Sequence, residues 1–173
     1  MSVISILCAD DLGKHAAELG ALMQACVLDG ASIGYVLPFT AQDGEAFWTR
    51  TVLPALRNGG RLLLVARRAG LIVGTVQLDY DTPPNQPHRA EVRKLMVHPA
   101  HRRQGIAQAL MAEVERRAAA LGRSLLTLDT RSGDAAQALY AALGYQVVGV
   151  IPGYCRDALS SRLDATTIMY KAT

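Results

Sequence analysis

From about residue 90 onward, the sequence alternates between short segments that favour strands and longer segments that favour helices. Aliphatic and β-branched residues cluster in the short segments, whereas apolar residues recur at helical spacing in the longer ones. The predicted succession is strand 90–97, helix 104–121, strand 125–130, helix 134–143, strand 147–151 and strand 167–170. Helices that alternate with strands in this way bury their apolar stripe against the sheet. The second half therefore predicts helices layered on a sheet.

The first half predicts a strand, two helices and a hairpin. The expected elements are a strand over 3–8, a helix capped by Asp10 or Asp11 that runs toward Asp29, a glycine-rich loop over 30–34, a helix over about 42–57, and hairpin strands over 61–66 and 71–78. Pro54 is expected to disturb the second helix. Both halves together predict the α/β (α+β) class, with a mixed central sheet of about seven strands and helices on both faces. We expect a single domain over residues 1–173.

Composition limits the classes of protein to which this chain could belong. Apolar residues make up 50% of its 173 residues, which is enough for one hydrophobic core. No apolar run approaches the roughly 20 residues that span a bilayer, so no membrane partner is expected. The opening MSVISILCADDLG lacks a basic segment and is expected to form a strand rather than a signal peptide.

Cysteine usage and charge narrow the expectations further. Cys8, Cys26 and Cys155 are scattered without a CxxC pair, so we expect small buried or half-buried thiols in a reducing cytoplasm, with no disulfide and no metal. The formal charge of +3 gives little reason to expect a nucleic-acid partner. A local positive field that suits a ligand with a few phosphates comes from Arg89, Arg93, Lys94, Arg102 and Arg103.

The segment 97–107, VHPAHRRQGIA, is the most informative stretch of the sequence. It predicts the end of a strand, a basic turn and the start of a helix. The first amides of a helix lack partners within the helix and lie at the positive end of its dipole. Gly105 and Ala107 leave these amides uncovered, so a phosphate could approach the main chain.

Other interpretations of this segment must be weighed. A helix start can be small and basic simply because it faces solvent. The P-loop pattern GxxxxGK[ST] is absent, and no GxGxxG motif directly follows the strand, as a dinucleotide site would require. A pyrophosphate site of a different strand–turn–helix design remains.

At these positions the chain resembles the GNAT acetyltransferase family. The family's coenzyme A loop reads Gln or Arg, two residues, Gly, one residue, then Gly or Ala, and here Arg102, Gly105 and Ala107 occupy those places. The preceding LMVHP, residues 95–99, is similar to the family's strand and its exit. Arg103 departs from the pattern, because many members have glycine there, and this raises the question of the local backbone angle.

The resemblance implies acetyl-CoA as cosubstrate. It implies that the pyrophosphate is held by the backbone amides of Arg103, Gln104, Gly105, Ile106 and Ala107. It also implies that Leu95, Met96 and Val97 hydrogen-bond the pantetheine arm and polarise the thioester carbonyl. An independent hint is that Val92, Leu95 and Val97 break a strict two-residue alternation, which predicts a bulge in this strand.

Tyr140 is the expected general acid. It lies in the sequence AQALYAALGY, residues 136–145, which resembles the family's second signature. By that match its phenol faces the coenzyme sulfur and protonates the thiolate leaving group. In an arbitrary protein, a helical tyrosine would instead pack with its hydroxyl at the surface. The family often has Asn seven positions earlier, where this chain has Gly133.

Two carboxylates are candidates for the amine side of the reaction. Glu91 lies at the start of the predicted coenzyme-binding strand, and Asp129 lies near the end of the next strand, where open α/β sheets place their ligands. Either could take the proton of the amine or bind the substrate ammonium. The alternative for each residue is a carboxylate without a catalytic role, held in a salt bridge or exposed to solvent.

A closer resemblance, to the tabtoxin-resistance acetyltransferases within the family, extends along most of the chain. The segments that carry it are GASIGY at 30–35, RAEV at 89–92, LTLDT at 126–130, PGYC at 152–155 and the tail from Thr166 to Lys171. It implies direct acetyl transfer to the primary amine of an amino-acid-like toxin or antibiotic, by a monomer or homodimer. A protein or peptide N-acetyltransferase and a non-catalytic acyl-CoA sensor are the alternatives.

Overall fold

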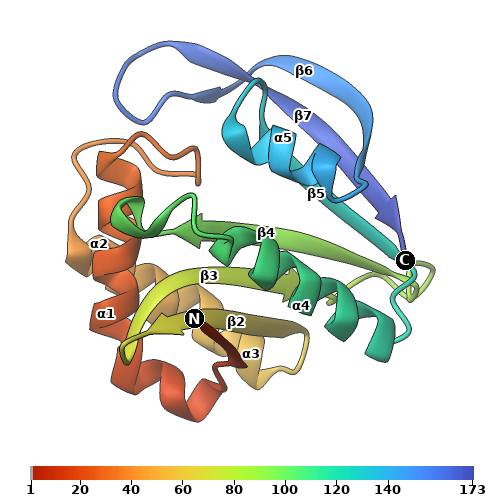
Figure 1. Ribbon diagram of the computed structural model, residues 1–173, viewed down its shortest axis with the longest axis horizontal. Helices are drawn as coiled ribbons and strands as arrows, with labels where there is room; N and C mark the ends of the chain where they lie inside the picture. Colours follow the sequence, from red (N-terminus) through yellow and green to blue (C-terminus); the bar gives the residue numbers. More distant parts are fainter. Residues whose placement is uncertain (1) are drawn as a thin grey trace.

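A seven-stranded mixed sheet forms the centre of the computed structural model, which describes residues 2–173 (Figure 1). The strands are β1 (Val3–Ile6), β2 (Arg61–Arg68), β3 (Leu71–Asp79), β4 (Arg89–Val97), β5 (Leu125–Arg131), β6 (Gln146–Arg156) and β7 (Leu163–Ala172). They lie in the order β1-β2-β3-β4-β5-β7-β6. Every pair is antiparallel except β4 and β5, which run parallel. The predicted mixed sheet of about seven strands is confirmed.

Helices cover both faces of the sheet, as predicted. They are α1 (Ala9–Leu28), α2 (Ala41–Phe47), a π-helical turn (Trp48–Val52), α3 (Leu53–Arg57), a 3-10 turn (Pro99–His101), α4 (Ile106–Ala120) and α5 (Ala135–Ala142). On one face, α1 packs with Trp48 against β2 and β3. On the other, α4 and Tyr140 of α5 share a second core with Leu64 and Leu126. Within the described residues, no helix is long and apolar enough to cross a membrane.

The first two predicted helices differ from the structure in detail. Helix α1 begins at Ala9 after an N-cap at Cys8, so the predicted cap at Asp10 or Asp11 is wrong and both acids lie inside the first turn. There their negative charges interact favourably with the positive end of the helix dipole. The predicted helix over 42–57 is divided by a π-helical turn just before Pro54. Because proline lacks an amide hydrogen and crowds the preceding turn, the wider turn relieves the clash.

Helices α1 and α2 approach each other so closely that their backbones touch at a pair of glycines. A Cβ atom on Gly20 would lie 2.4 Å from the carbonyl oxygen of Ala41, and one on Gly44 would lie 2.7 Å from the carbonyl oxygen of Gly20. The crossing fixes where the loop between the two helices, residues 29–40, leaves α1. That loop forms one wall of the groove described below.

Strands β4 and β5 pair only at their first residues and then part. The parallel register joins Arg89 to Leu125, Ala90 to Leu126 and Glu91 to Thr127, and no further pairs follow. Beyond Glu91, β4 stays bonded to β3, whereas β5 follows β7. The sheet therefore opens into a fork at its centre, which Figure 1 shows as the gap between β4 and β5.

Candidate functional site

A groove of about 830 Å³ fills the fork between β4 and β5. Its walls come from the second half of β4, the start of α4, the first half of α5, the end of β5 and the loop after α1. The residues predicted for coenzyme binding and catalysis all line this groove, with the single exception of Gln104. The exposed side chain of Gln104 instead bonds Arg68 at the end of β2.

The floor of the groove is a strand with a bulge. The pairing of β3 with β4 shifts by one residue between Thr75 and Gln77, and Lys94 has a φ of 52°. The bulge predicted from the broken alternation is therefore present. It changes which residues face each core: before it Val92 packs under α4, whereas after it Met96 packs under α1.

The start of α4 presents an open backbone to the groove. Arg103 has a φ of 60° and Gly105 a φ of 77°, both in the left-handed region. A Cβ atom on Gly105 would have no neighbour within 4 Å, so space is free above the first amides of α4. Arg103 adopts the glycine-like angle in spite of its side chain, at a cost of about 1 kcal/mol.

Arg102 is held by the protein rather than free in solvent. Its guanidinium pairs with Asp29 at the end of α1, and its Nε donates to the Val97 carbonyl oxygen at 3.3 Å. Both partners of the ion pair remain more than 40% exposed, so the pair is weak. Arg102 thus links the loop after β4 to the loop after α1.

The predicted positive field is divided between two places. Arg102 and Arg103 lie at the start of α4, whereas Arg93 pairs with Asp79 at 3.3 Å and Arg89 bonds Gln86. Lys94 points toward the loop after α1, where its Nζ donates to the Ile33 carbonyl oxygen at 2.8 Å. Of these cations, only Arg102 and Arg103 lie at the start of α4, where the sequence predicted a phosphate site.

Tyr140 is buried in α5, with only 6% of its surface exposed, and it lines the groove. Within residues 2–173 its hydroxyl has no hydrogen-bond partner. Burial, and then the negative charge of Asp129, raise the pKa of this phenol. The arrangement keeps a protonated hydroxyl available to the groove at neutral pH.

Glu91 and Asp129 lie on the same face of the sheet, opposite to the α4 core. Glu91 pairs in register with Thr127, and Asp129 follows two residues later along β5. The Glu91 carboxylate lies 3.6 Å from Nε of Arg93, and the Asp129 carboxylate accepts a hydrogen bond from the Thr166 hydroxyl at 3.1 Å. Asp129 is also the charge that reaches Tyr140. Both acids are thus available at the fork.

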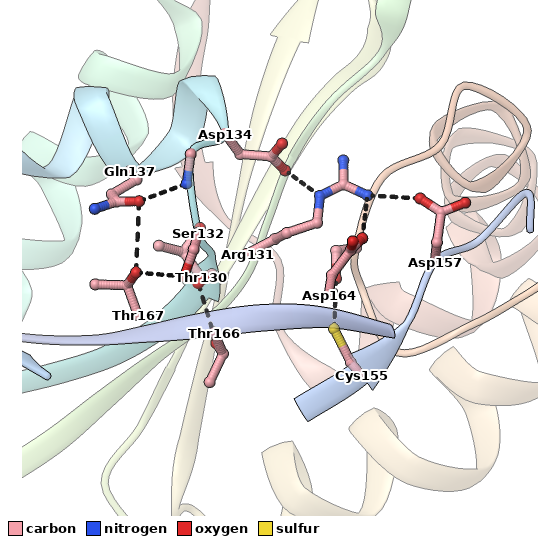
Figure 2. Close-up of polar contacts among 12 residues, drawn as sticks. Thr130, Arg131, Ser132, Asp134, Gln137, Cys155, Asp157, Asp164, Thr166 and Thr167 are labelled. Carbon is pink, nitrogen blue, oxygen red and sulfur yellow. Dashed lines mark hydrogen bonds and ion pairs between the residues drawn. The ribbon is translucent and has the colours of Figure 1, made fainter. Parts of the chain in front are cut away.

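Arg131, which lines the groove, is the centre of an ion-pair network that ties β5 to the connection between β6 and β7. Arg131 donates to Asp134 at 2.9 Å and to Asp157 at 3.2 Å, and it lies 3.5 Å from Asp164 (Figure 2). These ion pairs fix the 157–162 connection, which docks on the loop after α1 through the Leu37 amide and the Ala158 carbonyl oxygen at 3.0 Å. This network joins positions far apart in the chain, so no local sequence signal predicts it.

Two of the three cysteines, Cys26 and Cys155, line the groove. Cys26 is buried and Cys155 half-buried, as predicted, but Cys8 is exposed. The Cys155 thiol lies 3.5 Å from the Ser32 hydroxyl. Among residues 2–173, no group of three or more His, Cys, Asp and Glu side chains is arranged to hold a metal ion.

A model of the acetyltransferase (GNAT) family matches residues 21–145 of this chain. Acetyltransferase SG1711 of Sodalis glossinidius is 37% identical over 93 residues, which cover 53% of this chain and 62% of that protein. The chain therefore spans less than two thirds of this relative's length.

Solved structures share the fold at low sequence identity. The ribosomal-protein-alanine N-acetyltransferase of Brucella melitensis has a TM-score of 0.79 at 21% identity and covers 99% of both chains. The putative acetyltransferase yncA of Salmonella typhimurium, solved with its cofactor acetyl-CoA, has a TM-score of 0.79 at 20% identity, over 99% of this chain and 94% of that one. The predicted architecture is confirmed by these similarities.

Proposed function

Because this chain belongs to the acetyltransferase (GNAT) family, we propose that it transfers the acetyl group of acetyl-CoA to the primary amine of a small molecule. One observation carries the proposal. The open start of α4, the unpaired edge of β4 and the buried phenol of Tyr140 all line a single groove in the fork of the sheet.

The groove fits the coenzyme part by part. The uncovered amides from Arg103 to Ala107 suit a diphosphate, because they combine free donors with the positive end of a helix dipole. Arg102 and Arg103 add charge-assisted contacts. The main chain of Leu95, Met96 and Val97, on the side of β4 that β5 has left, offers groups for the amides and the thioester carbonyl of the pantetheine arm.

Acetyl-CoA, when bound, supplies the activated acetyl group as a thioester. The acceptor nitrogen, as a neutral amine, forms a bond to the carbonyl carbon while the carbon–sulfur bond breaks. Glu91 or Asp129 first removes one proton from the acceptor ammonium, directly or through water, and Tyr140 donates its proton to the sulfur that leaves. The acylated nitrogen then loses its second proton, which returns through water to the Tyr140 phenolate. The products are the N-acetyl acceptor, free coenzyme A thiol and one proton.

The position of the two acids inside the groove favours a small acceptor over a protein or peptide. Glu91 and Asp129 both line the groove, beside the half-buried Cys155 of β6 and Ser32 of the loop after α1. An amino-acid-like toxin or antibiotic, as the resemblance implies, is small enough to fit, and resistance is the role that this acceptor would suggest.

Incubating the protein with acetyl-CoA and a panel of primary amines should release free thiol and the acetylated amine in equal amounts. The panel should include amino acids, aminoglycosides and short peptides, with thiol release and product mass as the readouts. Preferential turnover of peptides would replace the small acceptor with the protein or peptide alternative. Tight acetyl-CoA binding by calorimetry, without turnover of any amine, would support an acyl-CoA sensor instead.

The same assay separates the two carboxylates. Glu91→Gln and Asp129→Asn each leave the shape of the groove nearly unchanged. Loss of the base should lower kcat by roughly 100-fold or more and remove the acidic limb of the pH profile. Loss of an ammonium ligand should instead raise KM with a smaller change in kcat. If neither substitution changes either constant, the assignment of both residues fails.

Replacing Arg103 by glycine should make the protein more stable but weaken its binding of acetyl-CoA. Relief of the left-handed φ should raise the free energy of unfolding by about 0.5–1 kcal/mol. Loss of the charge should weaken coenzyme affinity about three- to tenfold. Denaturant unfolding and calorimetry measure the two effects separately.

Two controls distinguish the backbone from the charge. Arg103→Ala keeps the strained angle, so only the affinity should fall. Ala69→Gly relieves a similar φ of 49° in the exposed turn between β2 and β3, so only the stability should rise. An unchanged affinity in both Arg103 variants would contradict a role for this side chain in coenzyme binding.

A further inference from the structure

Lys94 is a half-buried cation that lacks an acidic partner. Among the described residues 2–173, no carboxylate lies within 4 Å of its Nζ, which donates to the Ile33 carbonyl oxygen at 2.8 Å. The neighbouring cations differ, because Arg93 and Arg131 each pair with at least two acids. An ammonium group has three donors, so a single carbonyl leaves two of them unused. The Phe47 ring, whose centroid lies 5.9 Å from Nζ, offsets part of the desolvation cost of this cation, and a ligand carboxylate would offset more of it.

The fold places Lys94 in the groove by means of the β4 bulge. In a regular strand Lys94 would share a face with Ala90 and Val92, both of which are buried in the core beneath α4. The register shift and the φ of 52° turn its side chain instead toward the loop after α1. A bulge that redirects one side chain into a cavity, at an energetic cost to the backbone, is typical of a functional position.

Charges of both signs thus line the same groove. Glu91 and Asp129 contribute negative charge at the fork, and Lys94 contributes positive charge at the side of the α1 loop. Burial, followed by the charge of Arg93, lowers the pKa of Lys94, whereas Asp129 and Glu91 oppose this shift. Arg93 lies 3.6 Å from Glu91 and partly balances its charge. Asp129 is therefore the acid of the groove that has no cation paired with it among residues 2–173, and Lys94 is a cation that has no acid paired with it.

We infer that Lys94 binds the carboxylate of a zwitterionic acceptor whose amine lies at Glu91 and Asp129. The inference rests on the proposed acetyltransferase function and names the acceptor class as amino acids with a free carboxylate. Lys94 is then a specificity-determining residue, because it discriminates a carboxylate from its neutral amide without taking part in proton transfer. Its two remaining donors match the two oxygens of the carboxylate.

Acetyl transfer to paired acceptors tests this role. The probes are glycine, β-alanine, L-threonine, L-methionine and L-lysine, each with its primary amide, in the presence of acetyl-CoA. For the wild-type protein, kcat/KM of the preferred free acid should exceed that of its amide by roughly 10- to 100-fold. Lys94→Gln, which can still donate to the Ile33 carbonyl oxygen, should abolish this preference by raising KM for the acid. The amide should change by less than about threefold.

Matched variants show whether the effect belongs to this cation. Lys94→Arg should keep a preference for the free acid, whereas Arg93→Gln should not reverse it, because the Arg93 guanidinium is already paired with Asp79 and Glu91. Melting temperature and acetyl-CoA affinity, measured for every variant, report whether the fold and the coenzyme site are intact. Lys94→Met is a second neutral variant if the glutamine does not fold.

Each result decides between distinct conclusions. Equal use of acids and amides by the wild-type protein overturns the inference and leaves the acetyltransferase proposal standing. A fall in kcat for acid and amide alike in Lys94→Gln overturns it too, because that pattern indicates a proton-transfer role. If only amines without a carboxylate are acetylated, the acceptor class is wrong. If no amine at all is acetylated, the proposed function itself fails.

Discussion

Replacing Tyr140 by phenylalanine is expected to lower kcat for acetyl transfer by roughly 10²- to 10⁴-fold, the usual contribution of a positioned general acid. Acetyl-CoA affinity should change by less than about threefold, since the ring stays in place and the contact proposed for the phenol is with the leaving sulfur alone. Steady-state kinetics and calorimetry with coenzyme A measure the two effects. A variant with wild-type kcat would falsify the acid assignment.

The neighbouring Tyr145 provides a matched control. The centres of the two rings lie 5.7 Å apart, and both are buried in the same core. The Tyr145 hydroxyl is buried, has no hydrogen-bond partner among residues 2–173, and lies outside the groove. Tyr145→Phe therefore removes an equivalent oxygen and should leave kcat unchanged. A similar loss in both variants would mean that the effect comes from packing rather than proton transfer.

The pH dependence follows from the direction of the pKa shift. Because burial and Asp129 raise the pKa of Tyr140, the phenol stays protonated below its ordinary pKa of about 10. The acid is then present throughout the neutral range, so kcat should show no alkaline loss attributable to Tyr140 below about pH 10. An alkaline limb near pH 8 that disappears in Tyr140→Phe would contradict the raised pKa.

The sequence predicted the sheet and its helices because the signals for them are local. Apolar spacing identifies which face of a helix is buried, and glycine and proline mark the turns. The start of α4 was predictable for the same reason, since Gly105 and Ala107 directly follow the basic turn in the sequence. The bulge in β4 was visible as a break in alternation at Val92 and Leu95.

Other features depend on partners that are remote in the sequence. Nothing local to Glu91 indicates that β5 leaves β4 there, because the departure depends on the pairing of β5 with β7. Lys94 points toward the loop after α1, away from the basic turn at Arg102, because its backbone has a positive φ that a lysine rarely adopts. The pairing of Arg102 with Asp29 joins two loops about 70 residues apart. Such contacts are set by tertiary packing and could not be predicted from one sequence.

The wall of the groove formed by the loop after α1 also depends on the glycine contact between α1 and α2, which predicts the largest effect on stability. Gly20→Ala would place a methyl group 2.4 Å from the Ala41 carbonyl oxygen and 2.8 Å from the Glu45 amide nitrogen. Both atoms belong to the backbone of α2, so they can move away from the methyl group only if the two helices separate. We expect a loss of about 3 kcal/mol in the free energy of unfolding. This corresponds to a decrease of roughly 6–12 °C in Tm for a chain of this size.

Gly13 supplies the control for helix propensity, because it lies in the same helix with nothing within 4 Å of a Cβ atom. Gly13→Ala should therefore raise the free energy of unfolding by about 0.5–1 kcal/mol. Denaturant unfolding of the two variants should give changes of opposite sign, since the same substitution in one helix differs only in what the methyl group meets. Equal stabilisation in both would mean that α1 and α2 are not in backbone contact. The loop after α1, with its Ile33 carbonyl, would then be positioned by some other contact.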